Sequence, residues 1–328
     1  MKLKVIQVGV GGFGRGWLRT LVESDLADLT GIVDISDEAL AKARETHSLP
    51  QEICFKDQAE AVAATSPQAV VCVTPPQFHK DVALAAAGAG LHCMTEKPLS
   101  DDIASAREMV TAFDDAGVTL MVSQNYRHQP PARAIRQAVS DGRIGDVGAA
   151  EVRFFKGPHF GGFREEMAYP LVKDMAIHHV DLMRYLTGLD PLAVSAVSWK
   201  PTWSWFDGDP SVSAVFEMTS GAVVTYNGSW VSAAKETSWS ADWRIEGQAG
   251  TITWVGDDVT LHTAEGAESL EPLAPPYENL EESLHQFVSA VENGTEPETS
   301  GRDNLKSIEM VFRIIEAAEA GRRIEFTA

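Results

Sequence analysis

The chain has 328 residues, 44% of them hydrophobic, and a formal net charge of −20. This length suits two domains or one large domain, and the apolar fraction is enough to bury a sizeable core. Nucleic acid and anionic membranes are bound through clustered Lys and Arg, so the acidic surface argues against both as partners. No apolar run is long enough to span a membrane, and the first residues lack the apolar core of a secretory signal. We therefore expect a cytoplasmic protein.

Short apolar runs alternate with helical patterns through residues 1–122. Such runs are typical of buried parallel strands, and their alternation with helices predicts a doubly wound parallel sheet, an α/β domain of Rossmann type. One helix is expected to begin at Ser100, with Asp101 and Asp102 in its first turn. The expected strands cover residues 3–8, 29–34, 69–73, 91–95 and 118–122.

The pattern changes in residues 123–328. Pro130-Pro131 is expected to start a helix, and from Val147 onward apolar and polar residues alternate with a period of two, as in residues 212–218. One-sided alternation favours an antiparallel sheet with one face on helices, so we predict an α+β second domain. The helices that close this domain are also compatible with packing against the first domain. Their apolar stripes are Leu280, Leu284, Phe287 and Val291, then Leu305, Ile308, Phe312 and Ile315.

Residues 9–14, Gly-Val-Gly-Gly-Phe-Gly, satisfy the dinucleotide-binding pattern G-x-G-x-x-G. Gly9 would allow the tight turn, Gly11 the approach of the pyrophosphate, and Gly14 the close packing of helix on strand. The helix that follows supplies N–H groups and a positive dipole end to the phosphates. The motif is weak alone, but here it follows an apolar strand and precedes a helical stretch, as the fold requires.

Asp34 ends the next apolar run, where an acid is expected to accept hydrogen bonds from the adenosine ribose. The same carboxylate would repel a 2′-phosphate, and no basic residue follows it at once, so NAD is favoured over NADP. The alternative is that Asp34 only caps a helix that starts near Asp37.

Glu96-Lys97-Pro98 ends a later apolar run. An open α/β sheet binds its ligands at the carboxyl ends of its strands, so a lysine in this place is expected to face the nicotinamide.

Asp174 and His178 have the spacing i, i+4 in a helical pattern, and Asp181 extends the same face. A carboxylate beside an imidazole orients it and raises its basicity, which suits a general base. A divalent metal site and an ordinary buried ion pair are the alternatives, although no metal is assigned. His179 points away and is interpreted as structural.

Together these motifs, with Thr74-Pro75-Pro76 and His79, resemble the glucose–fructose oxidoreductase / inositol dehydrogenase / rhizopine-catabolism (Gfo/Idh/MocA) family. The resemblance spans the chain, including its closing Ala-Gly-Arg-Arg-Ile-Glu-Phe. It implies an NAD-binding Rossmann domain and a second domain with an open, mostly antiparallel sheet that binds substrate. The resemblance implies Lys97, Asp174 and His178 as the catalytic residues. The implied cofactor-binding residues are Gly9, Gly11, Gly12, Phe13, Gly14, Asp34, Thr74, Pro75, His79, Glu96 and Lys97.

Family members commonly oxidise a ring hydroxyl of a sugar, cyclic polyol or glycoside, or run the reverse. An enzyme that uses NAD transiently for glycoside cleavage or epimerisation, and a non-catalytic NAD or sugar sensor, are the alternatives. In this chain the usual small-residue run before the aspartate is replaced by residues 169–173, Tyr-Pro-Leu-Val-Lys. Basic residues near Asp174 and His178 in the sequence are compatible with a carboxylated substrate. The substrate-binding candidates are Tyr126, Arg127, Arg164, Lys173, Asp174 and His178.

Seven of the eight tryptophans follow residue 198. Packing within the sheet is their ordinary role. In the irregular stretch of residues 199–205 they would also suit the border of a sugar pocket, while an uncovered apolar sheet would suit contact with another subunit. We expect a homodimer or homotetramer formed through the sheet of the second domain.

Overall fold

The computed structural model describes residues 2–326. The chain divides into two units, Met1–Asn125 with Pro276–Leu305 and Tyr126–Pro275 with Lys306–Ala328. Each unit has its own β-sheet. Within the described residues, no helix combines the length and apolar character that a membrane span requires.

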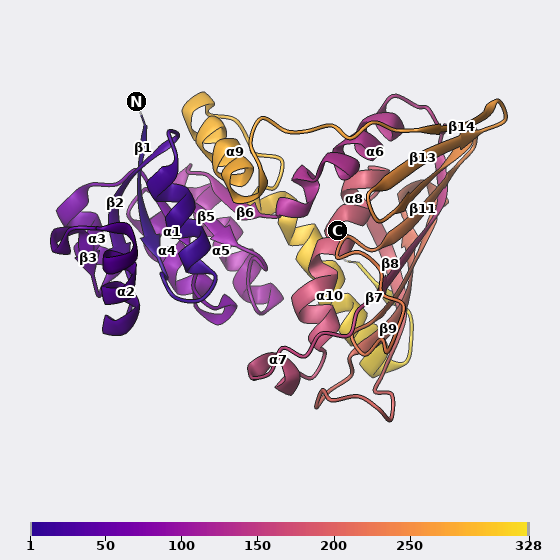
Figure 1. The fold of residues 1–328 in the computed structure, drawn as a ribbon, viewed down its shortest axis with the longest axis horizontal. Coiled ribbons are helices and arrows are strands. Elements are labelled where there is room, and N and C mark those ends of the chain that lie inside the picture. The colour runs from indigo at the N-terminus through magenta and orange to yellow at the C-terminus, as the bar shows by residue number, and fades with distance from the viewer. Residues whose placement is uncertain (1, 327–328) are drawn as a thin grey trace. The chain divides into compact units, whose positions relative to one another are not determined.

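The first unit is built on a six-stranded parallel sheet in the order β3-β2-β1-β4-β5-β6 (Figure 1). The central strands are buried apolar runs, as expected of a parallel sheet covered on both faces. The doubly wound sheet predicted from the sequence is therefore confirmed. Its strands are β1 (Leu3–Val8), β2 (Ala27–Val33), β3 (Cys54–Phe55), β4 (Ala69–Cys72), β5 (His92–Glu96) and β6 (Leu120–Ser123).

Among the described residues, helices α1 to α5 belong to this unit, and α9 joins it from the far end of the sequence. Leu284, Phe287 and Val288 of α9 are part of the same hydrophobic core as Val5 and Trp17. The helices are α1 (Gly14–Glu23), α2 (Asp37–His47), α3 (Gln58–Thr65), α4 (His79–Gly88), α5 (Ile103–Ala116) and α9 (Asn279–Asn293), with short 3-10 turns at Gln51–Ile53 and Pro76–Phe78.

Helix α5 begins later than the sequence indicated. Asp101 and Asp102 were expected in its first turn, but Asp102 is the extended N-cap, and its side chain accepts a 2.8 Å hydrogen bond from the Ser105 N–H. A carboxylate in this position satisfies an otherwise unpaired helix N–H, which explains why the helix begins only at Ile103.

The second unit contains a nine-stranded sheet in the order β14-β13-β12-β11-β7-β10-β9-β8-β15. All neighbours are antiparallel except β7 and β10. The open, mostly antiparallel sheet is thus confirmed. Its strands are β7 (Val147–Phe155), β8 (Pro191–Trp199), β9 (Ser211–Met218), β10 (Val223–Ser229), β11 (Asp242–Gly247), β12 (Gly250–Val255), β13 (Asp258–Thr263), β14 (Gly266–Ser269) and β15 (Ile324–Glu325).

Helices cover one face of this sheet (Figure 1). Every residue of α8 is buried, because the helix lies between the sheet and its neighbours. In α10 the fully buried positions include Val311 and Ile314, whereas Phe312 and Ile315 of the predicted stripe are only half-buried. The helices are α6 (Pro130–Ser140), α7 (Phe163–Glu166), α8 (Ala176–Thr187) and α10 (Gly301–Ala320, which starts in the first unit), with short turns at Asn125–His128 (η3), Leu171–Met175 (η4) and Thr219–Gly221.

The opposite face of the sheet carries exposed apolar side chains on adjacent strands. Trp199 is 43% exposed and Val197 64% on β8, while Val215 of β9 and Val223 of β10 are also exposed. By contrast, Trp243 and Trp254 lie on the covered face and are buried, as the packing interpretation of the tryptophans predicts.

Candidate functional site

The loop between β1 and α1 requires glycine at two places, at Gly9 for its backbone conformation and at Gly14 for lack of space. Gly9 has a φ of +91°, and a Cβ there would lie 2.6 Å from the Val73 carbonyl oxygen. A Cβ on Gly14 would lie 2.3 Å from the Gly9 carbonyl oxygen. A Cβ on Gly11 would meet no atom within 4 Å. This side of the loop is therefore open to a ligand.

Gln7 holds the loop from inside the sheet. Its side-chain Nε2 donates to the Gly9 carbonyl at 2.8 Å and to the Gly14 carbonyl at 2.7 Å, and the side chain is fully buried. The role of Gln7 was not predicted from the sequence. Its signal is a carboxamide that shortly precedes the glycine motif in a strand that is otherwise largely apolar.

The start of α1 suits an anion. Its N-cap, Phe13, makes no side-chain cap, and no acidic residue lies in the first turn. The Phe13 side chain is 61% exposed, and the space beside Gly12 is open. The Gly14, Arg15 and Gly16 N–H groups donate to the carbonyls of Gly11, Gly12 and Phe13, so it is the positive end of the helix dipole that α1 offers to the pyrophosphate of a dinucleotide.

Asp34 follows β2 and ties it to the glycine loop. Its Oδ2 accepts from the Val10 N–H and its Oδ1 from the Ser36 N–H, both at 2.9 Å. The helix cap is Ser36, whose hydroxyl accepts from the Ala39 N–H at 3.2 Å. The alternative that Asp34 caps α2 is therefore wrong. The next side chain, Ile35, is 88% exposed and carries no charge.

His79, one of the predicted cofactor-binding residues, is fully buried. Its Nε2 lies 2.8 Å from the Thr74 carbonyl oxygen and its Nδ1 lies 3.0 Å from the Pro98 carbonyl oxygen. Burial lowers the pKa of His79, and the two carbonyls oppose that shift. The ring therefore braces the loops that follow β4 and β5 and presents no surface of its own, whereas Pro75 in the first loop is exposed.

Glu96 and Lys97 stand at the end of β5. Glu96 Oε1 accepts from the Trp17 indole N–H at 2.6 Å, and Oε2 accepts from the Lys97 backbone N–H at 3.0 Å. Desolvation raises the pKa of Glu96, while the Trp17 hydrogen bond and the Lys97 charge lower it. Glu96 thus links α1 to the backbone of the lysine, which is half-buried and joined to Pro98 by a cis peptide bond. The role of Trp17 was not predicted.

Asp174 does not lie on the same α-helix as His178, contrary to the prediction. It belongs to the π-helical turn η4, and α8 begins only at Ala176. The Ala176 N–H donates to the Leu171 carbonyl, five residues earlier in the sequence. This hydrogen bond widens the turn, so side chains before and after it no longer follow one α-helical face.

The carboxylate of Asp174 is engaged by Arg164 of α7. Arg164 Nε donates to Asp174 Oδ2 at 2.7 Å, and the two side chains are 39% and 21% exposed. Lys173, also a substrate-binding candidate, is exposed.

His178 lies in the first turn of α8 and stacks on Tyr126 of η3. Their ring centroids are 4.0 Å apart and their planes differ by 21°. The neighbouring His179 is fully buried, with Nδ1 3.0 Å from the Tyr226 hydroxyl and Nε2 3.0 Å from the Trp239 carbonyl. His179 is therefore structural, as predicted.

Arg127 was a substrate-binding candidate, but its guanidinium is used inside the second unit. Nε and Nη2 donate to the two carboxylate oxygens of Asp181 at 2.7 and 2.6 Å, and Ser307 donates to the same carboxylate at 2.7 Å. Arg127 is 4% exposed and Asp181 1%. Arg127 therefore holds the Asp181 carboxylate in place, because moving it would leave a buried charge uncompensated.

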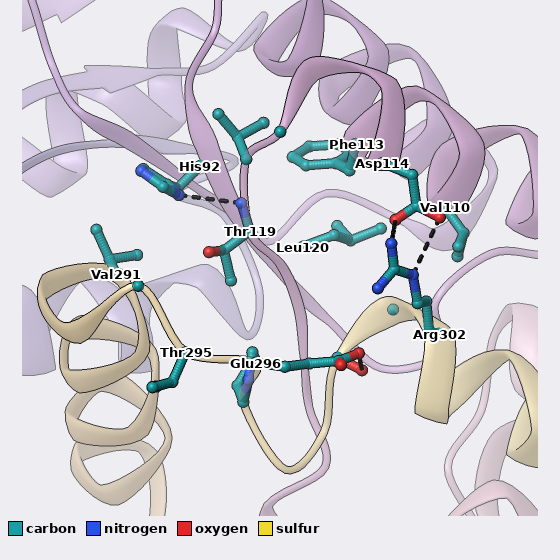
Figure 2. Close-up of a pocket in the computed structure, with 16 residues that line it drawn as sticks. His92, Val110, Phe113, Asp114, Thr119, Leu120, Val291, Thr295, Glu296 and Arg302 are labelled. Atoms are coloured by element: carbon teal, nitrogen blue, oxygen red, sulfur yellow. Dashed lines mark hydrogen bonds and ion pairs between the residues drawn. The ribbon is translucent and has the colours of Figure 1, made fainter.

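A hollow of about 280 Å³ lies elsewhere in the first unit (Figure 2). It is at the amino ends of β5 and β6, opposite to the edge that carries Lys97. Its polar groups bond one another: Arg302 pairs with Asp114 at 2.8 Å, and His92 accepts from the Thr119 N–H at 3.0 Å. It is therefore not the candidate catalytic site.

Two family models match the chain. Residues 3–124 match one described as an oxidoreductase family with an NAD-binding Rossmann fold, and residues 132–253 match the GFO/IDH/MocA C-terminal domain. The chain belongs to the Gfo/Idh/MocA oxidoreductase family. The resemblance drawn from the motifs is confirmed, and so is NAD as the dinucleotide of the Rossmann domain.

Relatives of this family member match along nearly its whole length. D-apiose dehydrogenase from Paraburkholderia graminis is 28% identical over 99% of this chain and 90% of its own. 1,5-anhydro-D-fructose reductase from Ensifer adhaerens is 28% identical over 97% of both chains. An oxidoreductase from Agrobacterium radiobacter, solved with NAD⁺, L-tartaric acid and magnesium, has the same fold, with a TM-score of 0.90 at 23% identity over 99% of this chain and 98% of that one.

Proposed function

We propose that this protein is an NAD-dependent dehydrogenase that acts on a ring hydroxyl of a sugar, cyclic polyol or glycoside. One observation carries the proposal most directly. Lys97 follows β5 at the carboxyl edge of the parallel sheet, the edge at which the open glycine loop after β1 also lies. Ligands of doubly wound sheets bind at that edge.

NAD⁺, when bound, supplies the hydride acceptor of the reaction. The chain contributes the glycine loop and the uncapped start of α1 to the pyrophosphate, and Asp34 to the adenosine ribose. Thr74, Pro75 and Glu96 shape the loops that border the nicotinamide end, and His79 holds two of these loops in place.

The catalytic roles follow from residue chemistry. His178 accepts the proton of the reacting hydroxyl, since a neutral imidazole is a suitable base near neutral pH. Lys97 donates a hydrogen bond to the same oxygen and stabilises the charge that develops on it. Asp174, held by Arg164, binds a neighbouring hydroxyl or orients the base, and Tyr126 fixes the plane of the His178 ring through their stack.

The substrate class is supported by the names of two relatives, a D-apiose dehydrogenase and a 1,5-anhydro-D-fructose reductase. It is also supported by the residue types, because carboxylate, imidazole and ammonium groups all bind hydroxyls well.

We also propose an oligomeric state and a cellular location for the protein. The exposed apolar side chains on β8, β9 and β10 support a homo-oligomer formed through the open sheet face. The three cysteines are free, which is consistent with a cytoplasmic protein.

A screen of inositols, monosaccharides, sugar acids and glycosides with NAD⁺ tests the proposal. The expected result is net NADH formation with at least one compound. Conversion of a compound without net NADH would replace the dehydrogenase with an enzyme that uses NAD transiently, and binding without conversion would indicate a sensor.

A further inference from the structure

Arg164 of α7 makes only partial use of its guanidinium. Its Nε bonds to Asp174, but within residues 2–326 neither of its terminal nitrogens has a hydrogen-bond partner. An arginine fork carries five donors, and the end-on pair of Nη atoms matches a planar carboxylate. The side chain is 39% exposed, so this pair of donors is accessible.

Two aromatic rings hold the guanidinium in place. Its central carbon lies 5.4 Å from the ring centroid of Phe160 and 5.0 Å from that of Phe163. Contacts of a guanidinium with ring faces leave its edges for hydrogen bonds. The exposed fractions of the rings, 40% and 66%, are large for Phe side chains of a folded protein.

We propose that Arg164 binds the carboxylate of an acidic sugar, so that the preferred substrate is a uronic acid and not a neutral sugar. The proposal rests on the proposed function, because Asp174, its fixed partner, is taken as a substrate-site residue. The Nε hydrogen bond keeps Asp174 in position, and the Nη edge then places the substrate carboxylate beside it.

The local charges favour a monoanion. Asp174 offsets part of the charge on Arg164, so a dianionic phosphate would be less well compensated there than a single carboxylate. The adjacent acid Glu165 is turned to the backbone, where it accepts from the Gly161 N–H at 2.8 Å. In a protein of net charge −20, a partly exposed arginine beside two aromatic rings is a local site for an anion.

The ion pair has a simpler explanation, in which Arg164 only positions Asp174. The two explanations differ in selectivity. A role in positioning Asp174 alone affects every substrate equally, whereas carboxylate binding adds a further loss for acidic substrates.

Paired substrates separate these explanations: D-glucuronate against D-glucose, D-galacturonate against D-galactose, and glucose 6-phosphate as the phosphate arm. For the wild type we expect kcat/KM to be about 10-fold or more higher for the acids than for their neutral partners. Arg164→Gln is expected to lower kcat/KM for the neutral sugars through loss of the Asp174 contact, and to lower kcat/KM for the acids by a further factor of about 10 or more.

Two further variants complete the test. Arg164→Lys keeps the charge but not the end-on pair of donors, so its loss of rate should be larger with acids than with neutral sugars, and it serves if the Gln variant does not fold. Arg322→Gln removes an exposed arginine from the same unit and should alter neither substrate class. Equal losses on acids and neutral sugars in Arg164→Gln would overturn the proposal, as would a wild type that prefers neutral sugars or the phosphate.

Binding distinguishes the failure of this inference from failure of the proposed function. If D-glucuronate raises the melting temperature of the NAD⁺-bound wild type but not of Arg164→Gln, and no compound yields NADH, the carboxylate site stands and the dehydrogenase does not. If only neutral sugars yield NADH, the dehydrogenase stands and the carboxylate site is refuted.

Discussion

Tyr126 lies face to face with His178, with ring centroids 4.0 Å apart. The two residues come from η3 and from the first turn of α8, so the stack joins two segments that are distant in the sequence. Burial raises the pKa of the Tyr126 phenol to about 12, and the ring therefore stays uncharged throughout the pH range of an enzyme assay. The contact fixes the plane of the imidazole without adding a titrating group.

This stack predicts different effects for two substitutions of Tyr126. Tyr126→Leu should lower kcat by about 3- to 10-fold, the value of one aromatic pair, because the His178 ring gains rotational freedom. Tyr126→Phe keeps the stack and should stay near the wild-type rate. Steady-state kinetics with the best substrate checks both. If the Phe variant were as slow as the Leu variant, the hydroxyl rather than the ring face would be the important group.

Asp34 should set the choice of cofactor. We expect kcat/KM to be higher with NAD⁺ than with NADP⁺, since the carboxylate at the end of β2 repels a 2′-phosphate. Replacing Asp34 with Ser and the exposed Ile35 with Arg should shift the ratio of the two values by about 10-fold or more toward NADP⁺. The single variant Ile35→Ala is the matched control. A wild-type enzyme that uses NADP⁺ as well as NAD⁺ would contradict the assignment.

Lys97 should act on the rate and not on cofactor affinity. Lys97→Ala is expected to reduce kcat by about 10² or more, because a positioned cation no longer stabilises the charge on the reacting oxygen. The dissociation constant of NADH, measured by fluorescence, should change little. A variant with near wild-type kcat would remove Lys97 from the mechanism.

His179 should make the fold sensitive to acid. Burial lowers the pKa of His179 from 6.5 to about 4, while the unfolded chain titrates near the ordinary value. Between these pH values the unfolded state binds more protons, so the free energy of unfolding falls as the pH falls, by up to about 1.4 kcal/mol per pH unit. The neutral ring satisfies both contacts, since Nε2–H donates to the Trp239 carbonyl and Nδ1 accepts from the Tyr226 hydroxyl.

Denaturant unfolding of wild type and His179→Gln from pH 7 to pH 4 tests this effect. The variant should be less stable at pH 7 but should show a flatter dependence on pH. If both proteins lost stability with the same slope, another group would be responsible.

Much of the fold could be predicted because its signals are local. Buried parallel strands are short apolar runs, so β1 was placed with its correct bounds and β4 to within one residue. Period-two alternation identified β9 in the same way. The two-residue edge strand β3 has too few residues to show any periodicity and was missed.

The site was less predictable because its partners are distant in the sequence. No spacing rule joins Arg127 to Asp181 or Trp17 to Glu96; both pairs exist only through tertiary packing. The π-helical turn at Asp174 could not be predicted either. The sequence spacing of Asp174 and His178 is four residues in a regular α-helix and equally in a helix that contains a π-turn.

The central claim is that hydride moves between the substrate ring and NAD as a net reaction, with His178 as the base. The most direct measurement uses the best substrate from the screen, deuterated at its ring carbons, and follows deuterium into NADH by mass spectrometry. We predict one deuterium in each NADH formed, and a rate that falls by about 10² to 10⁴ in His178→Ala. Turnover that leaves NADH unlabelled, or a His178→Ala variant with the wild-type rate, would contradict the account.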